Sequence, residues 1–105
     1  KDGWLINCSH PNAALAQEFW DYLDSVENGR RVGEFAIGTN EYLDRLIGNL
    51  LQDEKYPGVH VAFGNPYCNY TGATWESPLH VDVVIEQTTA WVDGKMIMKD
   101  GRFIY

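Results

Sequence analysis

The side chains best suited to chemistry include a histidine and an aspartate two residues apart, His80 and Asp82. They stand at the start of a stretch rich in β-branched residues, 80–85, which predicts a strand. Side chains two residues apart on a strand point to the same face, so these two can converge on one ion. His-x-Asp also arises often by chance, and a half-buried histidine bonded to an exposed carboxylate is the alternative interpretation.

Two further metal-competent side chains, His60 and Glu34, lie inside other predicted strands. His60 occupies the apolar segment 59–63, where a buried histidine needs a polar partner. Glu34 lies within 31–37, and a carboxylate in mid-strand is disfavoured by propensity and costly to bury unpaired. Each alone could be a solvent-facing strand residue, but three strands each offer a metal-competent group. We therefore predict a metal centre with the ligands Glu34, His60, His80 and Asp82.

The types of ligand indicate a catalytic site rather than a closed structural one. Imidazoles with carboxylates suit zinc, manganese, cobalt or iron(II), which accept mixed nitrogen and oxygen ligands. Closed zinc sites more often use thiolates, and the two cysteines, Cys8 and Cys68, do not stand at ligand spacing. We expect both to be reduced thiols. Tyr67 follows the His60 strand and is a candidate donor to developing oxyanion charge, against the alternative of an ordinary loop tyrosine.

The elements that must position these groups follow from hydrophobic periodicity. Apolar residues at helical spacing predict two helices, 13–26 and 41–51. Asn12 is the expected cap of the first helix, and Thr39 or Asn40 that of the second. Asp93-Gly94 is a preferred hairpin turn. Strands are predicted at 4–7, 31–37, 59–63, 80–85, 89–92, 95–98 and 103–105. We expect one α+β domain, 1–105, with a mostly antiparallel sheet and two helices.

Composition excludes several classes of partner. The chain has 15 acidic and 8 basic side chains, and its formal net charge of −7 repels nucleic-acid phosphates and anionic lipid. No apolar stretch approaches the roughly 20 residues that span a bilayer, and the first residues do not resemble a signal peptide. We therefore expect a cytoplasmic protein with no nucleic-acid or membrane partner. The opening at Lys1, without an initiator Met, favours a fragment of a longer enzyme.

Four blocks, in this order, resemble the C-terminal part of the aminopeptidase T group of metallo-aminopeptidases, peptidase family M29. They are GEFAIGTN (33–40), DEK (53–55), GVHVAFG (58–64) and LHVD (79–82). The resemblance covers the chain from about Arg31 onward. It implies that these 105 residues are the C-terminal metal-binding portion of a larger catalytic domain. The family's first glutamate ligand lies upstream of this portion and has no counterpart here.

The resemblance also implies roles for single residues. A pair of divalent ions, zinc, cobalt or manganese, is held in that family by carboxylates and histidines, which correspond here to Glu34, His60, His80 and Asp82. The family's catalytic tyrosine corresponds to Tyr67. The implied reaction is removal of N-terminal residues from peptides by metal-activated water. Glu34 would help to move the proton and Tyr67 would hydrogen-bond the tetrahedral intermediate, in an enzyme that the resemblance suggests is a homodimer.

Two other functions remain open at this point. A branch related to this fold comprises iron(II) ring-cleaving dioxygenases, and two histidines with a carboxylate can leave open positions for oxygen on iron. The chain could also be a non-catalytic assembly domain that keeps remnants of the site. In that case Trp20, Trp75 and Trp91 would be available for an interface.

Overall fold

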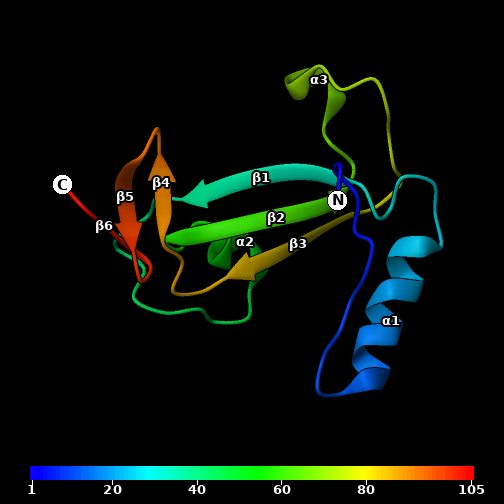
Figure 1. Ribbon diagram of the computed structural model, residues 1–105, viewed down its shortest axis with the longest axis horizontal. Coiled ribbons are helices and arrows are strands. Elements are labelled where there is room, and N and C mark those ends of the chain that lie inside the picture. The colour runs from blue at the N-terminus through cyan, green and yellow to red at the C-terminus, as the bar shows by residue number, and fades with distance from the viewer. The chain divides into compact units, whose positions relative to one another are not determined.

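The computed structural model describes all residues from Lys1 to Tyr105 and contains short helices and two small sheets (Figure 1). Strands β1, β2 and β3 form one three-stranded sheet in that order, and β4, β5 and β6 form another. The coarse α+β class with antiparallel sheets is therefore confirmed. The elements in chain order are α1 (Ala13–Asp24), β1 (Val32–Gly38), α2 (Leu50–Asp53), β2 (Gly58–Gly64), α3 (Cys68–Thr71), β3 (His80–Ile85), β4 (Ala90–Val92), β5 (Lys95–Lys99) and β6 (Arg102–Phe103).

Helix α1 begins where the sequence predicted. The side chain of Asn12 accepts hydrogen bonds from the backbone N–H groups of Ala14 and Leu15, at 3.1 and 3.3 Å, and so satisfies two donors that the first turn leaves unpaired. The helix ends at Asp24, two residues before the predicted end at 26. Phe19 of α1 packs edge to face on Phe63 of β2, with ring centroids 6.3 Å apart.

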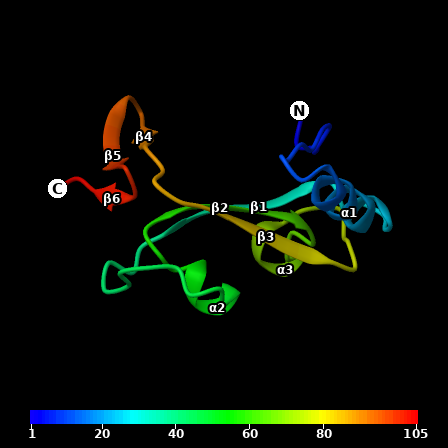
Figure 2. The same ribbon diagram turned by 90° about the horizontal axis from the view of Figure 1, so that it is seen from below.

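The prediction of a second helix at 41–51 is wrong over most of that range. Only Leu50–Asp53 is helical, a single turn in the connection between β1 and β2 (Figure 2). The carboxylate of Asp53 accepts the N–H groups of Ile47 and Gly48, each at 2.9 Å, and Asn49 caps the short turn. Gly48 also has a φ of +77°, which breaks a right-handed helix. Four of the six apolar residues at helical spacing are exposed, Tyr42 completely, whereas Leu43 and Leu46 are half-buried.

The predicted hairpin is confirmed. Strands β4 and β5 pair antiparallel, with Val92 opposite Lys95. The turn residues Asp93 and Gly94 have φ values of 49° and 79°, as a turn with two left-handed central residues requires. A second turn of the same kind, at Asp100 and Gly101, leads to β6, which lies at Arg102–Phe103 rather than at the predicted 103–105.

The strand expected at 4–7 is wrong, since only a single antiparallel bridge joins Trp4 to Arg31. The carbonyl of Leu5 accepts a hydrogen bond from the Arg30 guanidinium at 3.0 Å. A side chain thus takes the place of further backbone hydrogen bonds between two strands. The segment 64–78, which separates the predicted strands 59–63 and 80–85, contains one helical turn, α3. None of the helices is long and apolar enough to cross a membrane, and the longest, α1, has 12 residues.

The chain forms two compact units. One comprises 1–34 and 62–81, and the other comprises 35–61 and 82–105. The first unit contains α1 and α3 and buries Leu23 completely, whereas the second contains α2 and the hairpin and buries Met98 completely.

Candidate metal centre

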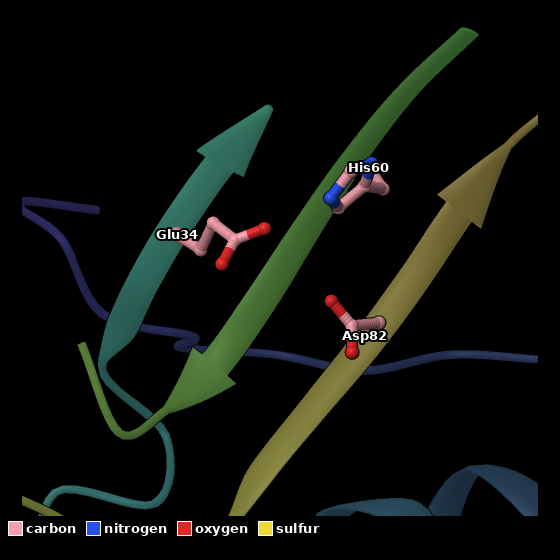
Figure 3. Close-up of side chains that lie close together, drawn as sticks. All are labelled: Glu34, His60 and Asp82. Atoms are coloured by element: carbon pink, nitrogen blue, oxygen red, sulfur yellow. The ribbon is translucent and has the colours of Figure 1, made fainter. Parts of the chain in front are cut away.

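Three side chains that can bind a metal come together on the first sheet. Glu34 is on β1, His60 on β2 and Asp82 on β3, and one ligand atom from each lies within 4.8 Å of the others. Figure 3 shows the three side chains directed toward one another from adjacent strands, whose arrowheads alternate in direction. His60 is buried, with 7% of its surface exposed, and the two carboxylates are half-buried. Neighbouring strands are about 4.8 Å apart, so side chains on one face of three strands can share one ion.

His80 adjoins this cluster through Glu34. It is two residues before Asp82 on β3, and its Nε2 lies 3.9 Å from Oε2 of Glu34. The carboxylate of Glu34 is therefore common to the His60 and Asp82 cluster and to the neighbourhood of His80. The other three residues nominated as ligands thus all lie within reach of Glu34.

The orientation of the His80 ring is set by a backbone carbonyl. Its Nδ1 is 2.8 Å from the carbonyl oxygen of Asn65. A carbonyl can only accept, so Nδ1 carries the proton and donates. In the neutral ring Nε2 then holds the lone pair on the side of Glu34. A histidine that gives one N–H to a carbonyl and presents the other nitrogen is the usual arrangement of a metal-binding histidine.

Tyr67, the tyrosine nominated from the sequence, lies against His80. The two ring centroids are 4.8 Å apart and the planes are inclined at 46°. Tyr67 is the residue before α3 and has a left-handed backbone, with φ 51° and ψ 64°. This conformation is uncommon for a bulky residue and is found at sites where the surroundings impose it. About half of the side chain is exposed, so the phenol can meet a ligand from solvent.

The close approach of the strands near the site requires glycine at position 33. A Cβ atom on Gly33 would lie 2.3 Å from the carbonyl oxygen of Gly64 and 2.9 Å from that of Asn65. Gly64 has a φ of +93° and would place a Cβ 2.3 Å from the carbonyl oxygen of Leu79. The backbone that precedes Tyr67 and His80 is therefore packed without space for side chains at either glycine. Sequence reasoning missed this requirement.

The loop that carries Tyr67 is tied to the start of β1 by aromatic and polar contacts. The guanidinium carbon of Arg31 lies 4.3 Å from the ring centroid of Trp75 and 5.6 Å from that of Trp4. Nδ2 of Asn28 donates to the carbonyl of Glu76 at 2.9 Å. Cation–π contacts of this kind stabilise by about 0.5–1 kcal/mol when exposed.

The two cysteines stand outside the cluster, as the sequence indicated. Both are free thiols. The thiol of Cys68 donates to the carbonyl of Trp75 at 2.9 Å, inside the loop. Cys8 lines a separate hollow of about 450 Å³ beside α1. The candidate ligands are therefore nitrogen and oxygen atoms only, which fits zinc, manganese, cobalt or iron(II).

No family model, curated protein or solved structure matches this chain.

Proposed function

We propose that this chain binds a divalent metal ion through Glu34, His60 and Asp82, with His80 as a further ligand, and serves an aminopeptidase-like hydrolase. The position of the Glu34 carboxylate carries this proposal. It lies within 4.8 Å of ligand atoms of His60 and Asp82, and 3.9 Å from the His80 imidazole. A carboxylate placed between two imidazoles can hold one ion or bridge two.

The donor chemistry supports a hydrolytic site. A divalent ion bound there would lower the pKa of a water molecule towards neutrality and polarise a substrate carbonyl. The protein's own contribution is to keep His80 in one tautomer through the Asn65 carbonyl, so that Nε2 is the nitrogen that faces Glu34. Glu34 is a candidate to accept and return the proton of the attacking water.

Tyr67 is the candidate partner of the reacting carbonyl. Its ring packs on His80, and the half-exposed phenol can donate a hydrogen bond to charge that develops on the carbonyl oxygen. A single donor of this type typically changes kcat by about 10²- to 10³-fold. We assign a peptide substrate because the four sequence blocks resemble the aminopeptidase T group. The net charge of −7 is compatible with a substrate that carries a free ammonium group.

The first test is metal binding by calorimetry. The metal-stripped chain is titrated with zinc, manganese, cobalt and iron(II), beside the nearly isosteric variants Glu34→Gln and Asp82→Asn. We expect each variant to lose at least about 10-fold in affinity, since even outer partners of a ligand contribute that much. Glu86→Gln is the matched control because Glu86 is an exposed carboxylate outside the cluster.

Equal affinity in the unaltered chain and in both carboxylate variants would reject the metal centre. Binding of iron(II) alone would favour the dioxygenase function over the hydrolase. The reaction is then tested with a short peptide that has a free N-terminus and with its acetylated counterpart. An aminopeptidase cleaves only the first, and Tyr67→Phe is expected to lower kcat by the factor given above.

A further inference from the structure

Asn65 lies at the junction between β2, Tyr67 and His80, and no role was assigned to it from the sequence. We propose that the Asn65 side chain is the positioning group that holds Tyr67 over the His80 ring. The inference concerns the site of the proposed function, so its relevance to catalysis rests on that function. The contact between the Tyr67 and His80 rings can be tested whether or not the chain is a hydrolase.

The backbone of Asn65 is fixed on both sides. Its N–H donates to the carbonyl of Leu79 at 2.6 Å, and its carbonyl accepts the Nδ1–H of His80 at 2.8 Å. Gly33 leaves the space that this carbonyl occupies, since a Cβ there would come within 2.9 Å of it. The backbone of residue 65 is thus attached to the strand that carries His80.

The side chain of Asn65 makes a hydrogen bond to the other residue of the ring pair, Tyr67. Its Oδ1 accepts the N–H of Tyr67 at 2.8 Å and closes an Asx-turn around Pro66. Proline at the centre fixes φ, and it also restricts the preceding residue to extended conformations. The turn delivers Tyr67 in the left-handed conformation, which costs free energy for any residue with a Cβ. One residue therefore connects the two rings, which lie 4.8 Å apart.

The alternative is an ordinary loop turn whose loss would be absorbed locally. The chain contains a matched example, because Oδ1 of Asn40 accepts the N–H of Tyr42 at 3.1 Å. Both turns have the pattern Asn-x-Tyr. Tyr42, however, is fully exposed and lies outside the metal cluster. Asn40→Ala is therefore the control for removing an Asx hydrogen bond without affecting the site.

The experiment measures the contact between the Tyr67 and His80 rings by NMR in the full chain. In Asn65→Ala we expect the ring-to-ring nuclear Overhauser effect to be lost and the Tyr67 amide resonance to shift. In Asn65→Asp, which keeps the acceptor oxygen, we expect the nuclear Overhauser effect and the Tyr67 amide resonance to match those of the unaltered chain. The contact is retained in Asn40→Ala. Retention of the contact in Asn65→Ala, or its equal loss in Asn40→Ala, would overturn the inference.

A second variant keeps the test decisive if Asn65→Ala does not fold. Glycine adopts the left-handed conformation without help, so adding Tyr67→Gly to Asn65→Ala is expected to recover the folded spectrum. Failure of this double variant to fold would count against the inference, because the lost stability would then have a cause other than the Tyr67 backbone.

The kinetic effect of Asn65→Ala distinguishes a role in positioning Tyr67 from a role in binding substrate or metal. Where the chain hydrolyses a peptide, Asn65→Ala is expected to lower kcat by about 10- to 100-fold with KM and metal affinity nearly unchanged. Absence of metal binding in the unaltered chain would reject the proposed function and leave the ring contact intact. An unchanged ring contact in Asn65→Ala would instead reject only the role of Asn65.

Discussion

Among single side chains, the last residue of the chain makes a specific contact with Glu41. The phenol of Tyr105 donates a hydrogen bond to the Glu41 carboxylate, although the two residues are 64 positions apart. This bond raises the pKa of Tyr105 above its ordinary value of 10.0, and desolvation and the negative charge of Glu41 act in the same direction. The folded chain therefore holds the phenol proton more tightly than the unfolded chain does.

The raised pKa gives a pH dependence of known sign. The contribution of Tyr105 to stability is complete below the unfolded pKa and is lost as the pH rises through the folded pKa. Glu41→Gln is expected to bring the pKa of Tyr105 down towards 10.0. An NMR titration of the Tyr105 ring measures this, with Asp44→Asn as the control carboxylate. An identical titration in Glu41→Gln and the unaltered chain would contradict the assignment.

At the level of elements, the connection between β1 and β2 shows how one side chain can override helical periodicity. Asp53 is buried, and its carboxylate accepts two backbone N–H groups of the residues that precede α2. Those amides would otherwise enter the ladder of the helix predicted at 41–51. The connection is an irregular loop because a local acceptor competes with helix hydrogen bonding.

Removing the Asp53 carboxylate tests this account. Asp53→Ala is expected to lower the free energy of unfolding by about 1–3 kcal/mol, because the N–H groups of Ile47 and Gly48 lose their acceptor. Asp53→Asn keeps one acceptor oxygen and should lose less. Urea denaturation measures both. Glu54→Ala is the control, since its exposed pair with Lys55 stabilises little. A loss in Glu54→Ala as large as in Asp53→Ala would refute the explanation.

Elements with local signals were predictable from the sequence. The cap at Asn12, the Asp93-Gly94 turn and the strand at His80–Ile85 each follow from a few neighbouring residues, and all three are confirmed. The segment 41–51 was not predictable from periodicity, because the outcome depends on Asp53.

The candidate site likewise has some features that the sequence could predict and others that it could not. Alternation on β3 places His80 and Asp82 on one face, which the sequence alone could show. The approach of Glu34 to His60 depends on which residues of β1 and β2 stand opposite each other. Alternation assigns a side chain to a face of its strand and does not by itself name its partner on the next strand. Asn65 was missed although its signal was present, since Asn-Pro before a tyrosine is a turn pattern.

At the level of the whole molecule, each compact unit has a small core of its own. Leu23 and Ala62 are completely buried in one unit, and Met98 is completely buried in the other. Few other apolar side chains are buried, so each of these positions accounts for a large share of its unit's burial. Stability is therefore sensitive to single core substitutions in either unit.

Core truncation tests this sensitivity. Leu23→Ala and Met98→Ala are each expected to lower the free energy of unfolding by about 2–5 kcal/mol, through lost burial and the cavity left behind. Leu51→Ala, at an exposed position, is the control. Hydrogen exchange followed by mass spectrometry measures the effect in each unit. Exchange in α1 that is no faster in Leu23→Ala than in Leu51→Ala would contradict the description of the first core.

The Arg31 guanidinium contacts the rings of Trp4 and Trp75, and Trp75 belongs to the loop that carries Tyr67. Indole emission responds to a cation held against the ring, so the stack gives Trp75 a spectral signature as long as the loop stays attached. Release of the loop from Arg31 would change the colour and intensity of this intrinsic emission. The emission of Trp4, Trp20 and Trp91 overlaps this signal, and Trp20 also has a cation, Arg30, over its ring. Stopped-flow fluorescence compared with a Trp75→Phe variant can therefore follow release of the loop without an added dye.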